Sequence, residues 1–234
     1  MNFNTIAGTA LSIGAVGAGL GLLLSLAARV CAAGKNRKAV PSDDAPAATL
    51  LPHTDTKNLT AVVHCSGGVH AGKKFRYQGL TDCISGMDLG EGAILCPYGC
   101  LGLGTCIAAC RVGAISLCDG VAMVDQDRCT GCFGCVGACP RNIIQPVPFV
   151  QSVLIPCLSR AKGMVSRSLC NIGCLGCRLC LKSCRFGAIS VTDNLAAIDY
   201  DKCTGCGDCA EKCPRRLIVD LQLGKGTLPR LEDS

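Results

Sequence analysis

Apolar residues form one long run at the start of the chain and only short runs after it. Residues 1–28 contain no Lys, Arg, Asp or Glu, and Ile6 to Ala28 form a run of predominantly apolar residues. About 20 such residues are enough for a helix to cross the hydrocarbon core of a bilayer. We therefore predict a transmembrane anchor over residues 1–31.

The charges after this run predict its orientation. Arg29, Lys35, Arg37 and Lys38 follow it directly, and positive residues flank the cytoplasmic side of a membrane helix. The rest of the chain is therefore expected on the cytoplasmic side. The alternative is a cleaved signal peptide, but its usual charged start is absent and the apolar run is longer than such peptides need.

The pattern changes again beyond the anchor. Residues 32–60 combine Pro, Ala and charges of both signs without periodicity, which predicts a flexible linker. From residue 61 onward the apolar runs are short and are bounded by turn residues, which predicts an α+β fold built from short strands and short helices. The predicted strands are 61–64, 114–117, 121–124, 142–144, 152–155, 188–191, 196–198 and 217–219.

Two of these strand pairs should be hairpins, and they recur along the chain. Asp119-Gly120 and Asp193-Asn194 separate them, and Asp-Gly is a strong signal for a tight turn. Nine of the ten cysteines from Cys83 to Cys139 reappear at the same offset of 74 residues, between Cys157 and Cys213. The sequence therefore predicts two tandem modules, 61–148 and 149–234, each with internal pseudo-twofold symmetry.

The cysteine spacing in the second module predicts iron–sulfur clusters. Two runs of the form C-x2-C-x2-C-x3-C are the ligand pattern of a two-cluster bacterial-type ferredoxin, in which the fourth cysteine of each run serves the other cluster. One [4Fe–4S] cluster should be held by Cys174, Cys177, Cys180 and Cys213. The other should be held by Cys203, Cys206, Cys209 and Cys184.

The composition favours a fold stabilised by metal binding over one stabilised by a large core of side chains. The chain has 22 Cys, three Tyr, five Phe and no Trp. A secreted disulfide scaffold or a zinc protein is the alternative. Zinc needs only four thiolates in two C-x2-C pairs, so the third close cysteine of each run favours iron–sulfur. The net charge of +6 comes without the basic and aromatic pattern of a nucleic-acid-binding protein.

The first module repeats this pattern with one gap. Its second run is complete, so one cluster should be held by Cys129, Cys132, Cys135 and Cys110. In its first run Leu103 stands where the repeat has Cys177, which leaves Cys100, Cys106 and Cys139 for the other cluster. We predict Cys96 as the fourth ligand. A three-iron centre or an empty site is the alternative.

Several cysteines then remain without a partner. Cys65, Cys83, Cys157 and Cys170 are four in number, and they either hold a fifth cluster or are buried free thiols. Cys118 is read as a plain strand residue, and Cys31 as a bystander or lipidation site at the membrane edge. His64 and His70 flank Cys65, where packing roles are expected in preference to cluster ligation.

The chain from Ala61 onward resembles the B subunit of the Rnf-type ion-translocating electron-transport complex. The resemblance is carried by Cys96 to Cys106 and by Asp199 to Cys206, and the anchor helix fits it. It implies a bacterial inner-membrane complex that takes electrons from soluble ferredoxin to flavin-bearing and NAD-binding subunits and exports sodium ions or protons. Members usually carry another four-cysteine domain after the anchor, and residues 32–60 contain no cysteine.

The sequence thus predicts an electron-transfer subunit of a ferredoxin:NAD oxidoreductase translocase. No arrangement of His, Ser or carboxylate residues indicates a catalytic site of its own. A polyferredoxin of another membrane oxidoreductase, of the hydrogenase or formate dehydrogenase type, is the alternative, and a structural zinc or disulfide protein is a third class. Four clusters are expected, or five if the remaining cysteines bind one.

Overall fold

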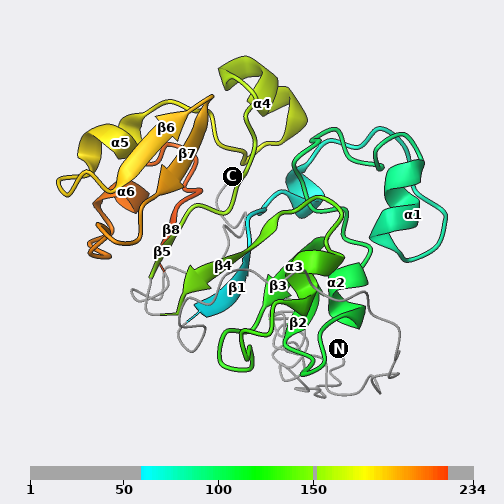
Figure 1. The fold of residues 1–234 in the computed structure, drawn as a ribbon. Helices are drawn as coiled ribbons and strands as arrows, with labels where there is room; N and C mark the ends of the chain where they lie inside the picture. The colour runs from blue at the N-terminus through cyan, green and yellow to red at the C-terminus, as the bar shows by residue number, and fades with distance from the viewer. Residues whose placement is uncertain (1–58, 150–151, 221–234) are drawn as a thin grey trace, which may run out of the picture. The chain divides into compact units, whose positions relative to one another are not determined.

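The computed structural model describes residues 59–149 and 152–220, and Figure 1 shows their arrangement. The predicted anchor, 1–31, and the predicted linker up to residue 58 lie outside the described residues. Residues 59 and 60, which the sequence assigned to the linker, are the start of strand β1. In the part of the chain that is described, no helix is both long enough and apolar enough to cross a membrane.

The described residues form short helices and short strands, which confirms the predicted mixture of helix and strand. The elements in order are β1 (Leu59–Val63), η2 (Gly68–His70), α1 (Cys83–Asp88), α2 (Thr105–Ala108), β2 (Ile115–Cys118), β3 (Val121–Val124), α3 (Gly134–Ala138), β4 (Ile144–Pro148), β5 (Val153–Leu154), α4 (Gly163–Leu169), α5 (Leu179–Ser183), β6 (Ile189–Thr192), β7 (Leu195–Ile198), α6 (Asp208–Glu211) and β8 (Val219–Asp220). We call residues 59–149 the first repeat and 152–220 the second repeat.

Both predicted hairpins are present. β2 pairs antiparallel with β3, and β6 with β7. The two turn residues have positive φ in each case, +49° and +77° at Asp119 and Gly120, and +49° and +62° at Asp193 and Asn194. Positive φ at both central residues is what the tight turn of a two-residue hairpin requires, so the turn dipeptides located these elements.

A second strand pair closes each repeat. β1 pairs antiparallel with β4, placing Val63 opposite Ile144, and β5 pairs antiparallel with β8, placing Leu154 opposite Val219. The first and last strands of each repeat are therefore neighbours, as Figure 1 shows for β1 with β4 and β5 with β8. This pairing brings Cys139, after α3, and Cys213, after α6, back toward the first strand of each repeat.

Four one-turn helices follow the cysteine loops, and all begin in the same way. The residue before each helix has a left-handed backbone: Gly104 before α2, Phe133 before α3, Arg178 before α5 and Gly207 before α6. Each helix carries one buried cysteine, which is Cys106, Cys135, Cys180 or Cys209. The sharp turn from loop into helix thus buries the third cysteine of each run.

Buried apolar residues form a separate core in each repeat. In the first, Ile115, Val121 and Ile144 pack with Cys100, Cys106 and Cys135. In the second, Val153, Ile189 and Leu217 pack with Cys180 and Cys209. A third cluster contains Ala71, Ile94 and Cys96 from the first repeat and Cys170 and Ile172 from the second. Cysteines therefore take the place of large side chains in all three.

Candidate metal centres

The second repeat gathers its eight predicted ligands into the two predicted sets. Cys174, Cys177, Cys180 and Cys213 line one cavity, which encloses about 420 Å³ of space not filled by atoms, part of it open to solvent. Cys184, Cys203, Cys206 and Cys209 line another of about 330 Å³. The crossing of the fourth cysteine of each run to the other set is thus a property of the fold.

Burial and the charges of neighbouring thiols together raise the pKa of cysteines in these sets. Burial, followed by the charges of Cys203, Cys180 and Cys206, raises the pKa of Cys209 to about 12. Thiolate is the form that binds iron, and a bound metal removes the proton from a coordinating thiol. These cavities therefore suit thiols whose charge a metal cluster would compensate.

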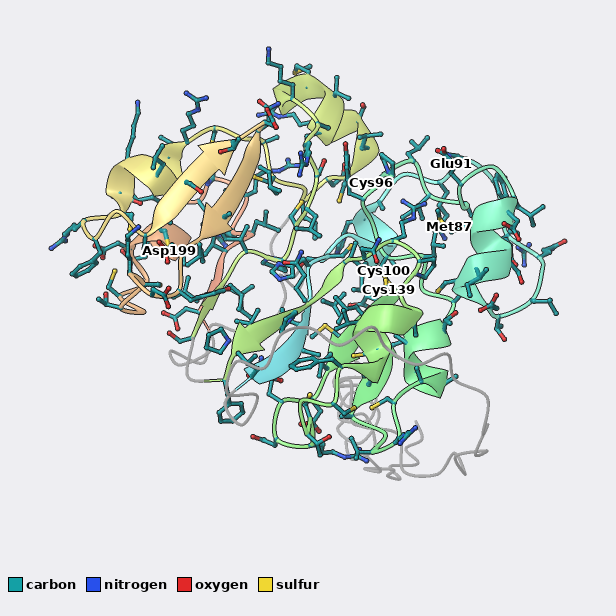
Figure 2. The ribbon with its side chains drawn as sticks, viewed as in Figure 1. Met87, Glu91, Cys96, Cys100, Cys139 and Asp199 are labelled. Carbon is teal, nitrogen blue, oxygen red and sulfur yellow. The ribbon has the colours of Figure 1, made fainter. Side chains whose placement is uncertain are left out.

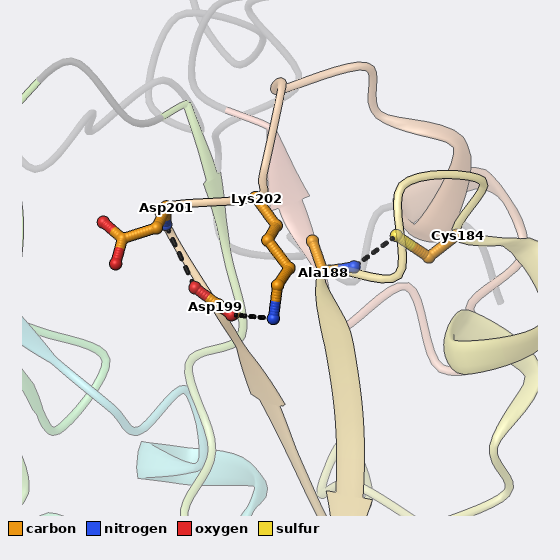
Figure 3. Close-up of polar contacts among 5 residues, drawn as sticks. All are labelled: Cys184, Ala188, Asp199, Asp201 and Lys202. Carbon is orange, nitrogen blue, oxygen red and sulfur yellow. Dashed lines mark hydrogen bonds and ion pairs between the residues drawn. The ribbon is translucent and has the colours of Figure 1, made fainter.

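Backbone hydrogen bonds reach the sulfur atoms from the same chain. The N–H of Ala188 donates to Sγ of Cys184 at 3.3 Å, as Figure 3 shows. The residue at the end of the same hairpin, Asp199, accepts from the N–H of Asp201 at 3.1 Å and pairs with Nζ of Lys202 at 2.7 Å. A hydrogen bond from a backbone N–H to sulfur, such as that from Ala188, stabilises a charged sulfur ligand and adjusts the reduction potential of a cluster bound to it.

The complete run of the first repeat shows the same features. Cys135 lies in the core of the first repeat, and Cys110 and Cys129 pack against that core. Burial, and then the charges of Cys129, Cys132 and Cys110, raises the pKa of Cys135 to about 11. The N–H of Ala114 donates to Sγ of Cys110 at 3.2 Å, which matches the contact between Ala188 and Cys184 in the second repeat. The predicted set of Cys110, Cys129, Cys132 and Cys135 is therefore brought together.

At the cluster site of the incomplete run, the fourth cysteine is Cys83, where the sequence predicted Cys96. Cys83, Cys100, Cys106 and Cys139 line a cavity of about 390 Å³. Burial, and then the charges of Cys100, Cys83 and Cys139, raises the pKa of Cys106 to about 12. Cys96 does not line this cavity. The structure thus supplies a fourth cysteine for the gap at Leu103, but from a different part of the chain.

Helix α1 positions Cys83 through a contact with α2. The Asp82 carboxylate caps α1 by accepting from the N–H of Ser85 at 2.8 Å. The hydroxyl of Thr105, next to Cys106, donates to Asp82 at 2.8 Å and accepts from the N–H of Cys83 at 2.6 Å. Thr105 thus ties the two cysteines of one cavity together. Asp82 followed by Ser85 was a visible signal for a helix start, but nothing local in sequence indicated its contact with Thr105.

We expect Asp82→Ala to destabilise the start of α1, and with it the position of Cys83. Loss of a helix N-cap commonly costs about 1 kcal/mol, equivalent to about a fivefold larger open population. Iron should therefore leave the cavity of Cys83 several times faster when a chelator is added to anaerobic protein. Thr105→Val, which removes the bridging hydroxyl, should act in the same direction.

Asp88→Ala is the matched control, because Asp88 is an exposed residue at the end of the same helix. It should release iron at the rate of the parent protein. Equal rates for Asp82→Ala and Asp88→Ala would contradict the role of the Asp82–Thr105 contact.

Cys96 lies instead with the cysteines that the sequence left over. Cys65, Cys96, Cys157 and Cys170 line one cavity of about 410 Å³ between the two repeats. The predicted set for a fifth cluster contained Cys83 in place of Cys96, so the structure exchanges these two residues. Sequence reasoning paired Cys83 with Cys157 by the repeat offset, but Cys83 begins α1 whereas Cys157 forms an isolated bridge with Cys65.

Arg141 fixes the main chain at Cys96. Its guanidinium donates to the carbonyl oxygen of Cys96 at 2.8 Å and to that of Glu91, and its Nε lies 3.2 Å from Sδ of Met87. Figure 2 labels Met87, Glu91 and Cys96, together with Cys100 and Cys139. Because Arg141 follows Cys139 by two residues, it connects the closing run of the first repeat to the loop that carries Cys96. Sequence reasoning missed this residue.

The remaining candidate residues do not enter these sets. His70 ends η2 and is half-buried, and Cys118 ends β2. Cys31 lies outside the described residues. Within 59–149 and 152–220, no three His, Cys, Asp or Glu side chains converge closely enough to hold a single metal ion. Sixteen of the described cysteines instead line four cavities in sets of four.

Comparison with known proteins identifies the chemistry of the second repeat. Residues 173–217 match the 4Fe-4S dicluster domain family. This match covers both sets of the second repeat, and the donor sets described above fit [4Fe–4S] clusters. The prediction that the chain carries multiple [4Fe–4S] clusters is confirmed.

Three curated relatives, all B subunits of ion-translocating complexes, extend the likeness over most of the chain. The chain is 41% identical over 71% of its length to that of the Na(+)-translocating ferredoxin:NAD(+) oxidoreductase complex of Acetobacterium woodii. It is 40% identical over 70% to that of the ion-translocating oxidoreductase complex of Methanosarcina acetivorans, and 38% identical over 70% to that of the proton-translocating ferredoxin:NAD(+) oxidoreductase complex of Clostridium ljungdahlii. The matches span 51%, 63% and 59% of these relatives. The resemblance found in the sequence is thereby confirmed.

Proposed function

We propose that this relative of the B subunits of ion-translocating oxidoreductase complexes is a membrane-anchored iron–sulfur electron carrier. It passes electrons between soluble ferredoxin and partner subunits that bind flavin and NAD, within a complex that exports ions. Support comes from the relatives, two of which are named ferredoxin:NAD(+) oxidoreductase subunits. The chain is the conduit of such a complex and converts no substrate at a site of its own.

The observation that carries this proposal is the grouping of cysteines in sets of four around small cavities. Three such cavities, lined by residues of one repeat each, enclose about 420, 390 and 330 Å³. Each contains one cysteine from a one-turn helix, one from the loop before that helix and one from the opposite run. The fourth is a second loop cysteine in two of the cavities, and in the third it is Cys83 of α1. A protein that only needed structural metal or disulfides would not require this repeated arrangement.

The residues of the chain have three tasks in this function. Thiolates bind the clusters, which when bound supply one-electron transfer. N–H groups such as those of Ala114 and Ala188 donate to ligand sulfur atoms and adjust their charge. Buried side chains such as Ile144 and Leu217 exclude water from the cavities that they line, which lowers the local dielectric constant and strengthens these interactions.

The location that we propose is the bacterial inner membrane. A single helix within residues 1–31 holds the chain there, and both repeats lie on the cytoplasmic side. Support comes from the uncharged apolar run and the basic residues that follow it. A cytoplasmic position also agrees with the reducing environment that keeps thiols available for clusters.

Reduced ferredoxin tests the proposed electron donor directly. The full chain, purified without oxygen, is mixed with a catalytic amount of bacterial ferredoxin that a ferredoxin-reducing enzyme keeps reduced, and the visible absorbance of the chain's clusters is followed. The absorbance should fall on mixing and should not fall when ferredoxin is omitted. Bleaching by dithionite but not by reduced ferredoxin would contradict this donor. Absence of visible absorbance would contradict the carrier role itself.

A further inference from the structure

The cavity between the repeats is lined by two cysteines from each of them. Cys65 and Cys96 come from the first repeat, and Cys157 and Cys170 from the second. Cys65, Cys96 and Cys170 are only 7–8% exposed. The cavity measures about 410 Å³, close to the 420 Å³ of the cavity that Cys174, Cys177, Cys180 and Cys213 line. It therefore has the same number of cysteines as a site that matches the dicluster family, and the two volumes, each partly open to solvent, are similar.

Equivalent residues of the two repeats hold the two sides of this cavity. Arg141 donates to the carbonyl oxygen of Cys96 at 2.8 Å, and Arg215 donates to that of Cys170 at 3.0 Å. Cys96 and Cys170 are 74 residues apart, as are the two arginines. Each repeat thus presents a cysteine on a main-chain segment held by its own arginine, and the cavity lies where the two segments meet.

Cys65 and Cys157 are also equivalent in their contacts, although the repeat offset does not relate them. They pair with each other in an antiparallel bridge. Sγ of Cys65 accepts from the N–H of Cys100 at 3.2 Å, and Sγ of Cys157 accepts from the N–H of Cys174 at 3.4 Å. Each sulfur therefore accepts a hydrogen bond from the backbone N–H of the first cysteine in the neighbouring run, as expected for charged sulfur ligands.

Further features of the cavity fit a bound group. The N–H of Gly67 donates to Sγ of Cys65 at 3.3 Å. A Cβ at Gly67 would lie 3.4 Å from Sγ of Cys170 and 3.6 Å from Sγ of Cys65, so a glycine keeps the space between these sulfurs open. His64 lines the same cavity and is 9% exposed, and its Nε2 has no hydrogen-bond partner in the described part of the chain.

We propose that Cys65, Cys96, Cys157 and Cys170 hold a fifth cluster, of the four-iron class, between the two repeats. This inference rests on the proposed function, because it assumes that the chain carries such clusters. The site would connect the cavities of the two repeats through the N–H groups of Cys100 and Cys174. It would also tie the repeats together, since each provides half of the ligands and metal binding is coupled to folding.

Iron and acid-labile sulfide per chain, measured on full-length protein purified without oxygen, test the site. The parent protein should contain about 20 irons, at four per cluster. Cys96→Ala combined with Cys170→Ala removes two ligands from the same set, so this double variant should contain about 16. If the two residues served different clusters, the double variant would fall to about 12, which would overturn this ligand set.

A second variant keeps all cysteines. Gly67→Leu should fill the cavity, and the backbone of Gly67, with φ −64° and ψ −60°, accepts any residue. It should also lower the iron content to about 16. Gly163→Leu is the matched control, because a Cβ at Gly163 meets no atom within 4 Å; it should keep the parent content.

The two proposals fail in different ways in this experiment. A parent protein with about 16 irons, unchanged by Cys96→Ala with Cys170→Ala and by Gly67→Leu, would overturn the fifth cluster and leave the electron-carrier function standing. A parent protein without iron or sulfide would overturn the proposed function itself. Loss of about four irons in both variants, but not in Gly163→Leu, is the result that we expect.

Discussion

Cys209→Ala is expected to remove one whole cluster, about four irons per chain, and to loosen the second repeat. Cys209 is 8% exposed and lies in the core of the second repeat with Val153 and Leu217. It also lines the cavity shared by Cys184, Cys203 and Cys206. Loss of this thiolate therefore affects a ligand set and a core at once. Iron analysis and mapping of tryptic cleavage sites measure both effects.

Cys135→Ala provides the matched control for this variant. Cys135 stands 74 residues before Cys209 and occupies the same place in the first repeat, inside α3. It should lose the same amount of iron, while the new cleavage sites fall in residues 59–149 and not in 152–220. A Cys209→Ala protein with the iron content of the parent would remove Cys209 from its ligand set.

Cys83→Ala is expected to cost between about one and about four irons per chain, as the cavity of Cys100, Cys106 and Cys139 becomes a three-iron centre or loses its cluster. Adding Leu103→Cys should restore the parent content. The backbone supports this rescue, because Gly102 and Gly104 have φ of +70° and +87°, close to the +64° and +63° at Gly176 and Arg178 around Cys177. Iron content and the electron paramagnetic resonance signal of a three-iron centre are the measurements.

The control for this rescue is Leu103→Cys combined with Cys96→Ala. Cys96 lines the cavity between the repeats, so a new thiol at position 103 should not restore the iron lost with it. Rescue of Cys96→Ala but not of Cys83→Ala would return Cys96 to the site beside Cys100. The two rescues thus assign each cysteine to one cavity.

The features that sequence reasoning located were those that depend on local spacing. The hairpin of β2 and β3 follows from the Asp119-Gly120 turn, and that of β6 and β7 from Asp193-Asn194. The sets around Cys135, Cys180 and Cys209 follow from runs in which three cysteines are close in sequence. Such loops determine the positions of their own three cysteines, and the fourth, from the other run, follows from the paired runs of a two-cluster ferredoxin.

The exchange of Cys83 and Cys96 could not be predicted in this way. Cys83 reaches its cavity because α1 is tied to Thr105, 22 residues away, and because Leu103 packs against Gly86 of that helix. Leu103, read from sequence as a missing ligand, is a packing residue for the helix that brings the ligand. The repeat offset paired Cys83 with Cys157, although the contacts of Cys157 match those of Cys65.

The most direct test of the central claim, that this chain is an iron–sulfur electron carrier, is the ratio of acid-labile sulfide to iron in protein purified without oxygen. We expect one sulfide per iron, with about four irons for each set of four cysteines. Bound zinc without sulfide would contradict the claim, because four thiolates around a single zinc ion transfer no electrons.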